Sequence, residues 1–288
     1  MKTRKINRQS IAVSGFTSIL HRYENMPSEL YITGKLPSGR IPAVAIVGSR
    51  KPTKYGEAVT YKLAYELAKC GVVIISGLAY GVDAIAHKAA LEAGGTTIAV
   101  LANGLHRVYP AGHAALAKQI VQQGGALVSE YPEGQEAHKY HFLARNRLVS
   151  GLADAVIVTE ATDKSGTFST VAHAIAQNKE VFAIPGPITS LLSAGPNRLL
   201  QEGAHVVLAT NDVLDIIAPA IPKVQTQLPL GNTPLEARII ELIQNGIHNG
   251  EAIQQRLDVS TEVYLQALTM LELNGVVQSA GGNQWQIA

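Results

Sequence analysis

Short apolar runs alternate with helical patterns along most of this chain, and this alternation limits the possible folds more than any other feature. Residues 43–47 (AVAIV) are apolar at every position and too few for a helix, which is typical of a central strand covered on both faces. A helical pattern follows at residues 54–69. Five further apolar runs occur, at residues 72–75, 97–101, 127–129, 155–159 and 181–184. Six alternations of strand and helix predict an α/β fold with a doubly wound parallel sheet.

Small residues end four of the predicted strands, at residues 48–50, 76–81, 102–104 and 165–166. The carboxyl ends of parallel strands meet at one edge of a sheet, so several helix N-termini, each with a partial positive charge, face one crevice there. Arg50 and Lys164 add charged donors, which favours an extended or multiply charged anion. An ordinary turn with an exposed arginine is the alternative for residues 48–50 taken alone.

The sequence lacks the motifs of the common nucleotide sites. None of the loops has Gly-x-Gly-x-x-Gly spacing, and Ser76 ends the second strand where a ribose-binding carboxylate would stand, so NAD binding is disfavoured. There is no Walker A sequence. The single cysteine, Cys70, excludes an internal disulfide framework and a cysteine-based zinc site, and the nine histidines have no metal-ligand spacing. We therefore expect no cofactor and no metal.

Composition indicates a globular protein with a large core. Of the 288 residues, 47% are hydrophobic and 16% are charged. No apolar run reaches the about 18 residues that span a bilayer, and residues 1–10 are basic and polar without an apolar segment. We expect a cytoplasmic protein that makes no membrane contact.

The chain divides into four parts by pattern and composition. Residues 1–29 are predicted to form a basic arm with weak patterning, and residues 30–218 the α/β domain. Residues 219–234 are rich in proline and turn residues, which is typical of a linker. Residues 235–288 contain three helical patterns and a hairpin, which predicts a small winged-helix-like domain.

Charge is distributed unevenly between these parts. Residues 1–220 contain 21 lysines and arginines against 16 aspartates and glutamates, whereas residues 233–288 contain two against six. A polyanion would therefore bind the larger domain. The expected recognition helix of the winged-helix-like domain carries Glu262 and Glu272 and no basic residue, so we expect it to contact protein rather than duplex DNA.

Several sequence motifs, occurring in the same order, resemble those of the bacterial DNA processing protein A family, also called DprA or Smf. The resemblance covers residues 27 to about 215 closely and the C-terminal segment more loosely. It is carried by Val44–Arg50 (VAIVGSR), Ser76–His87 (SGLAYGVDAIAH), Thr97–Pro110, Ser129, Glu130 and Pro132, Arg145–Leu152 (RNRLVSGL), Glu160–Thr167 (EATDKSGT) and Val181–Gly186 (VFAIPG).

The resemblance implies a binding protein rather than an enzyme. Its members have an extended Rossmann-like fold, hold and protect single-stranded DNA, help to load the RecA recombinase during natural transformation, and commonly act as homodimers. Carried over residue by residue, the resemblance assigns DNA contacts to Ser49, Arg50, Lys164, Ser165 and Gly166. It assigns the RNR motif, Arg145, Asn146 and Arg147, to the same basic region.

An enzyme is the alternative function. The cytokinin-activating phosphoribohydrolases have a similar Rossmann variety and carry a Pro-Gly-Gly-x-Gly-Thr-x-x-Glu motif. The nearest stretch here, residues 164–171, lacks that glutamate. We therefore assign no catalytic residue.

Helix geometry separates residues that are close in the sequence. Arg145 and Arg147 lie about 200° apart around a helix, so we expect one of them to pair internally, with Asp154 or Glu160. Asp83 and His87 are four residues apart on one helix face, and we expect them to form an internal, fold-stabilising pair rather than a metal or acid-base site.

Three aromatic side chains fall on or near the predicted crevice: Tyr80, Tyr109 and Phe142. Aromatic rings next to a basic groove can stack on unpaired bases. The alternative, which is common for aromatic residues in loops, is that they close the hydrophobic core.

Overall fold

A computed structural model describes residues 9–221 and 233–287. The chain separates into two compact units, residues 1–224 and 225–288. Within the described ranges, no helix combines the length and the hydrophobicity needed to cross a membrane.

The first unit is built on one nine-stranded sheet with the order β1-β2-β6-β5-β4-β3-β7-β8-β9. Strands β3 to β9 are parallel to one another, whereas β2 is antiparallel to β6 and β1 is antiparallel to β2. The strands are β1 Gln9–Ala12, β2 Glu29–Gly34, β3 Ala43–Val47, β4 Val73–Ser76, β5 Thr97–Val100, β6 Ala126–Ser129, β7 Ala155–Val158, β8 Glu180–Ala183 and β9 His205–Val206.

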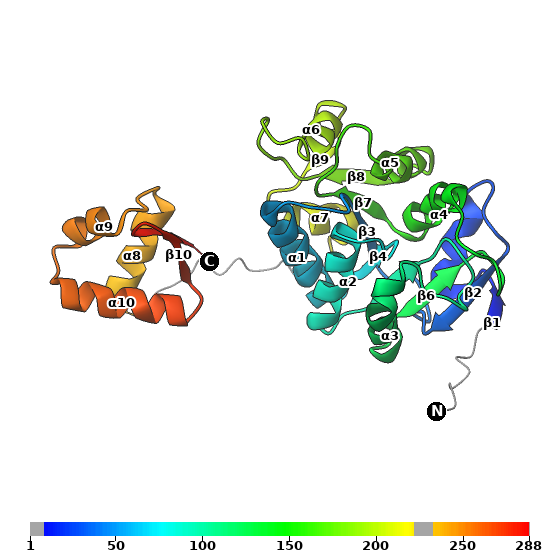
Figure 1. The fold of residues 1–288 in the computed structure, drawn as a ribbon, viewed down its shortest axis with the longest axis horizontal. Helices are drawn as coiled ribbons and strands as arrows, with labels where there is room; N and C mark the ends of the chain where they lie inside the picture. The colour runs from blue at the N-terminus through cyan, green and yellow to red at the C-terminus, as the bar shows by residue number, and fades with distance from the viewer. Residues whose placement is uncertain (1–8, 222–232, 288) are drawn as a thin grey trace. The chain divides into compact units, whose positions relative to one another are not determined.

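Helices cover both faces of this sheet (Figure 1). On one face lie α1 Lys54–Lys69, α2 Val82–Glu92, α3 Ala114–Gln122 and α7 Thr210–Ile217. On the other lie the 3-10 helix η1 Gly15–Arg22, α4 Lys139–Leu152, α5 Thr167–Ala176 and α6 Ala194–Gln201. Strand β3 shows why: Val44 and Ile46 pack with α1, whereas Ala43, Ala45 and Val47 face the opposite layer. The predicted doubly wound sheet is confirmed.

The direction of winding reverses beside β3. From β3 the chain adds β4, β5 and β6 on one side, and it then returns to place β7 on the other side of β3, followed by β8 and β9. The crevice at such a switch point is where open α/β sheets bind ligands. A ligand site is therefore expected between the loops after β3 and β7.

The basic arm predicted for residues 1–29 is wrong from residue 9 onward. Strand β1 pairs with β2, and η1 buries Phe16 and Leu20 completely or nearly so against α4 and the sheet. The apolar residues of η1 are spaced three to four positions apart, a pattern masked by the surrounding basic residues. Elements α6, β9 and α7 were not predicted either, and β9 has only two residues.

The second unit has its own core. Its elements are α8 Pro234–Gln244, α9 Gly250–Leu257, α10 Thr261–Leu273 and the antiparallel hairpin of β10 Val277–Gly281 and β11 Gln284–Ile287. Side chains of Thr233, Asn249 and Ser260 accept hydrogen bonds from backbone amides at the three helix N-termini. Three helices and a hairpin occur in the order expected for residues 235–288. Most of the predicted linker, residues 222–232, lies outside the described residues.

Candidate nucleic-acid interface

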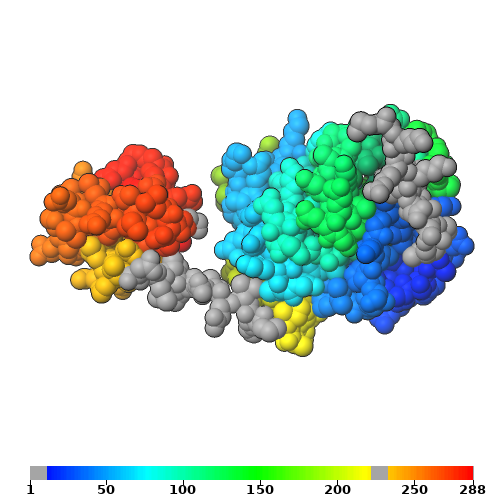
Figure 2. Space-filling view, turned by 90° about the horizontal axis from the view of Figure 1, so that it is seen from below, coloured from blue at the N-terminus to red at the C-terminus, as the bar shows by residue number. Residues whose placement is uncertain are grey.

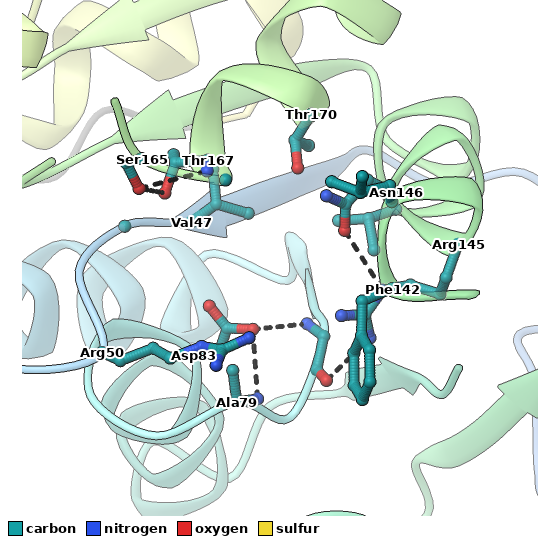
Figure 3. Close-up of a pocket in the computed structure, with 15 residues that line it drawn as sticks. Val47, Arg50, Ala79, Asp83, Phe142, Arg145, Asn146, Ser165, Thr167 and Thr170 are labelled. Carbon is teal, nitrogen blue, oxygen red and sulfur yellow. Dashed lines mark hydrogen bonds between the residues drawn. The ribbon is translucent and has the colours of Figure 1, made fainter. Parts of the chain in front are cut away.

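A hollow of about 240 Å3 opens where β3 and β7 end (Figure 3). The loop after β3, the loop after β4, the helix α4 and the N-terminus of α5 enclose it. Its lining residues are Val47, Gly48, Arg50, Gly77, Ala79, Asp83, Phe142, Leu143, Arg145, Asn146, Val149, Ser165, Gly166, Thr167 and Thr170. The switch point thus contains an open site bordered by polar groups from four segments that are distant in the sequence.

The loop after β3 is tied to the loop after β7. The Ser49 amide donates to the Glu160 carbonyl at 2.6 Å, and the Glu160 carboxylate accepts from the Thr53 amide and hydroxyl at 2.8 and 2.6 Å. A Cβ atom on Gly48 would lie 2.8 Å from the Glu160 carbonyl oxygen, so glycine is required for this close approach. The Ser49 amide therefore already has an acceptor, which the neighbouring loop supplies.

Arg50 is the exposed cation of this side of the hollow. Its side chain borders the hollow in Figure 3, and it forms no salt bridge among the described residues. Arg50 also lines a smaller adjoining hollow. An unpaired guanidinium at the rim is well placed to bind an anion bidentately.

The N-terminus of α5 forms the side opposite Arg50. The Ser165 amide donates to the Thr162 carbonyl at 3.0 Å, and the Ser165 hydroxyl accepts from the Thr167 amide at 3.2 Å. The Ser165 amide is therefore already bonded within its own loop. For the Gly166 amide, the described part of the chain supplies no acceptor. Lys164 is exposed next to Ser165 but is not part of the lining.

Arg145 is an internal residue and not a rim cation. It is 5% exposed and donates to the carbonyls of Gly77, at 2.8 Å, and Val100. Burial lowers the pKa of its guanidinium, and the Asp83 carboxylate opposes that shift. A Cβ on Gly77 would lie 2.5 Å from the guanidinium, so the loop after β4 folds directly onto this arginine.

Asp83 fixes the other side of the same loop. Its carboxylate accepts from the amides of Gly77 and Ala79 at 3.0 and 3.2 Å. Burial raises the pKa of this carboxyl, and Arg145 and the two amides counteract the rise. Asp83 and Arg145 together hold the loop after β4 in the shape that lines the hollow.

The expected pair of Asp83 with His87 does not form. The His87 ring bonds through Nδ1 to the Thr97 hydroxyl at 2.6 Å, on β5. Burial lowers the pKa of His87 to about 3, so the ring is neutral at ordinary pH. Both side chains stabilise the fold, as expected, but each through a different neighbour.

The partners predicted for the RNR motif are also wrong. Arg147 pairs with Glu130 at 2.5 Å, whereas Asp154 pairs with Arg40 at 2.5 Å and Glu160 accepts from Thr53. The middle residue of the motif, Asn146, lines the hollow, and its side-chain oxygen accepts from Arg145. Of the three motif residues, Asn146 is therefore the one whose side chain is not held, within the described ranges, by an ion pair or by backbone carbonyls, and it can offer a ligand a neutral donor.

Aromatic side chains border the adjoining hollow of about 70 Å3. Tyr80 and Tyr109 are each 51% exposed, and the rings of Tyr109 and Phe142 lie 5.2 Å apart. The alternative that these tyrosines close the core does not hold. Thr167 and Thr170 also line the main hollow and were not predicted, although their spacing of three residues at the start of α5 places them on one helix face.

Of the sequence-predicted site residues, the structure brings Arg50, Arg145, Asn146, Ser165 and Gly166 together around the hollow. Ser49 and Lys164 adjoin it along the chain. Arg145 supports the site from inside, and Arg147 forms an ion pair away from its lining.

Comparison with known sequences gives consistent matches. A family model described as DNA recombination-mediator protein A matches residues 10–218. Protein Smf of Escherichia coli K12 is 44% identical over 189 residues, which are 66% of this chain and 50% of that protein. DNA processing protein DprA of Bacillus subtilis is 37% identical over 213 residues, which are 73% of this chain and 71% of that protein.

Two solved structures are similar to this chain over about three quarters of its length. DNA processing protein A from Streptococcus pneumoniae has a TM-score of 0.67 and 38% identity, with 73% of this chain and 74% of that chain covered. DNA processing protein A from Helicobacter pylori, whose structure was described for a single-stranded DNA binding mode, has a TM-score of 0.67 and 32% identity, with 76% and 99% covered.

The match with the curated relatives is partial in length: the chain spans 50% of the E. coli protein and 45% of a putative DNA processing protein DprA from Mycobacterium tuberculosis. The family model nevertheless covers nearly the whole first unit, including both loops that border the hollow. The chain therefore belongs to the DNA recombination-mediator protein A family.

Proposed function

We propose that this chain is a non-catalytic single-stranded DNA-binding protein. In this proposal it acts in the cytoplasm as a homodimer, protects incoming DNA and helps to load RecA during natural transformation and recombination. The observation that carries the proposal is the hollow at the switch point, with the unpaired Arg50 on one side and the N-terminus of α5 on the other.

The charges of the hollow suit a sugar-phosphate chain. Arg50 contributes a guanidinium, and the Gly166 amide and the helix dipole of α5 contribute partial positive charge. Lys164, next in the chain, would neutralise a neighbouring phosphate. The Glu160 and Ser165 contacts fix the backbone of the two loops, so little backbone ordering is needed when an anion binds.

The adjoining aromatic side chains suit unpaired bases. Tyr109 and Phe142 lie in the smaller hollow, which shares Arg50 and Arg145 with the main one. A strand whose phosphates contact Arg50 would have bases within reach of these rings, and such stacking contributes about 1–3 kcal/mol per base. Duplex DNA has no unpaired bases to offer, so this arrangement favours single strands.

The comparisons support the same class of ligand. The H. pylori relative was described for its single-stranded DNA binding mode, and the matching family is described as a recombination mediator.

RecA loading is tested by strand exchange on DNA first coated with single-strand binding protein, where this chain should raise the rate of strand exchange. Light scattering should give the mass of a dimer.

One experiment separates binding from the enzymatic alternative. Wild-type protein is titrated with labelled oligothymidine and, in parallel, incubated with nucleoside monophosphates. We expect salt-sensitive binding and no release of free base. Release of base, or no binding of oligothymidine at low salt, would refute the proposal.

A further inference from the structure

We propose that the outer face of α1 is a second contact surface for the DNA strand, reached after the strand leaves the hollow. This inference rests on the proposed single-stranded DNA binding, and it extends the DNA contacts from the hollow along α1. We define the α1 track as Lys51, Tyr61, Lys62, Tyr65 and Lys69, together with Lys88 of the neighbouring helix α2.

Helix geometry places the four track residues of α1 on one face. Tyr61, Tyr65 and Lys69 are separated by four residues each, so they follow one another along the helix, and Lys62 lies seven residues before Lys69, on the same face. The opposite face of α1 buries Leu63, Ala64 and Leu67 in the core. Sixteen residues give the helix a length of about 24 Å, which is long enough to contact several nucleotides.

The track begins at the hollow. Arg50 lines the hollow, Lys51 follows it directly, and α1 starts at Lys54 after its N-cap Thr53. Because Glu160 holds Thr53, the start of the helix is fixed relative to the loop after β7. A strand that leaves the hollow past Arg50 therefore meets the first turn of α1.

The helix α2 extends this surface sideways. Both helices follow neighbouring parallel strands on the same sheet face, and the Tyr61 hydroxyl donates to Glu92 of α2 at 2.7 Å. The exposed Lys88 lies one turn before Glu92, on the side nearer to the hollow. Figure 2 shows the light-blue and cyan segments, which include these two helices, as a continuous part of the surface.

The unpaired charges of the track are positive. Among the described residues, Lys51, Lys62 and Lys88 form no salt bridge. The five lysines of this surface, Lys51, Lys54, Lys62, Lys69 and Lys88, outnumber the three nearby carboxylates. Glu57 pairs with Lys54 at 2.7 Å, Glu92 accepts from Tyr61, and Glu66 accepts from Thr210 of α7. The surface therefore attracts a polyanion.

The tyrosines add stacking surfaces between the lysines. The rings of Tyr61 and Tyr65 are stacked with their centroids 5.9 Å apart, and Lys69 lies 5.5 Å above the Tyr65 ring. Tyr61 is 39% exposed. Alternating aromatic and basic side chains are the arrangement that binds single strands without sequence preference.

The test uses two lengths of labelled oligothymidine with the full chain. An oligonucleotide of about six nucleotides is short enough to occupy the hollow alone, and one of about thirty also reaches the track. The variant is Lys62→Ala/Lys69→Ala. The controls are Lys118→Ala, an exposed lysine on α3, and Arg50→Ala in the hollow.

We expect the double variant to bind the long oligonucleotide about tenfold more weakly, with a salt slope that is shallower by about 1.4, and to bind the short one as wild type does. Equal binding of the long oligonucleotide by variant and wild type would overturn the track. Equal weakening for both lengths, or the same loss with Lys118→Ala, would also overturn it. If wild type binds neither length, the proposed function itself fails.

Discussion

Acidic side chains are placed differently at the strand-end edge of the first unit and on the surface of the second unit. In the first, the carboxylates of Asp83 and Glu160 are buried and hold loops, and the described residues that line the hollow include no exposed carboxylate. In the second unit most of the acidic residues are exposed: Glu241, Glu251, Asp258, Glu262 and Glu272. A site for a polyanion thus requires that acidic residues nearby be used internally.

The two units also differ in what their exposed helices present. Helix α1 shows lysines and tyrosines, whereas α10 shows Val263, Leu265, Met270 and Leu273 beside its two glutamates. Acidic surface repels phosphate, and exposed apolar surface favours protein contacts. The role in protein contact that we expect for residues 235–288 follows from this difference.

The largest expected effect concerns the buried charges of the first unit. Replacing Arg145 by Met leaves Asp83 buried without its cation, so we expect a loss of about 3–5 kcal/mol in the free energy of unfolding, measured by urea denaturation. Arg147→Met breaks a less buried pair and serves as the matched control, with a smaller loss expected. Equal losses for the two variants would contradict an organising role for Arg145.

The next effect concerns base stacking beside the hollow. Tyr109→Ala should weaken binding of oligothymidine by about 1–3 kcal/mol, because one stacking surface is removed. Tyr109→Phe keeps the ring and should bind as wild type does. If the phenylalanine variant loses as much affinity as the alanine variant, stacking is not the function of this ring.

Acid sensitivity separates the interiors of the two units. The pKa of the buried His87 is lowered to about 3. Between about pH 6.5 and pH 3, this histidine is therefore protonated in the unfolded chain and neutral in the folded chain. The contribution of His87 to the free energy of unfolding is therefore fully present above pH 6.5 and decreases as the pH falls towards 3. This residue should contribute up to about 1.4 kcal/mol per pH unit.

His87→Gln should make the free energy of unfolding less dependent on pH. This is measured by urea denaturation at several pH values, with unfolding monitored by circular dichroism. His248→Gln, an exposed histidine of the second unit, should leave the pH dependence unchanged. Trp285 is the chain's one tryptophan, so its fluorescence reports the second unit separately. An unchanged pH dependence in His87→Gln would contradict a lowered pKa of this ring in the folded state.

The smallest expected effect tests the second unit as a DNA contact. Arg238 and Arg256 are the two basic residues of residues 233–288. The double variant Arg238→Ala/Arg256→Ala should bind single-stranded and duplex DNA within about twofold of wild type, because the surface around them is acidic. A large loss of duplex binding would assign DNA recognition to this unit.

Local patterns predicted the parts of the fold that depend on local sequence. Strand β3 and helix α1 have the predicted bounds because an apolar run and a 3.6-residue period are visible within a few residues. Strands β1 and β9 were missed because they are short and exist through pairing with distant strands. Their sequences alone carry little signal.

The same distinction applies to the site. The glycine loops located the hollow correctly, since parallel topology brings strand ends together. The roles of individual residues depended on partners far away in the sequence: Glu160 for the Ser49 amide, and Gly77 and Val100 for Arg145. A motif shows that an arginine is needed at a position, but only its surroundings show whether it faces the ligand or the interior.

Arg50 offers the most direct test of the account. Labelled oligothymidine is titrated with wild type and with Arg50→Ala across a series of salt concentrations, with Lys118→Ala as the control. The account predicts weaker binding by Arg50→Ala at low salt and a logarithmic salt slope that is shallower by about 0.7, the loss of one phosphate contact on a single strand. An Arg50→Ala protein that matches wild type in affinity and slope would contradict the assignment of the hollow as the DNA site.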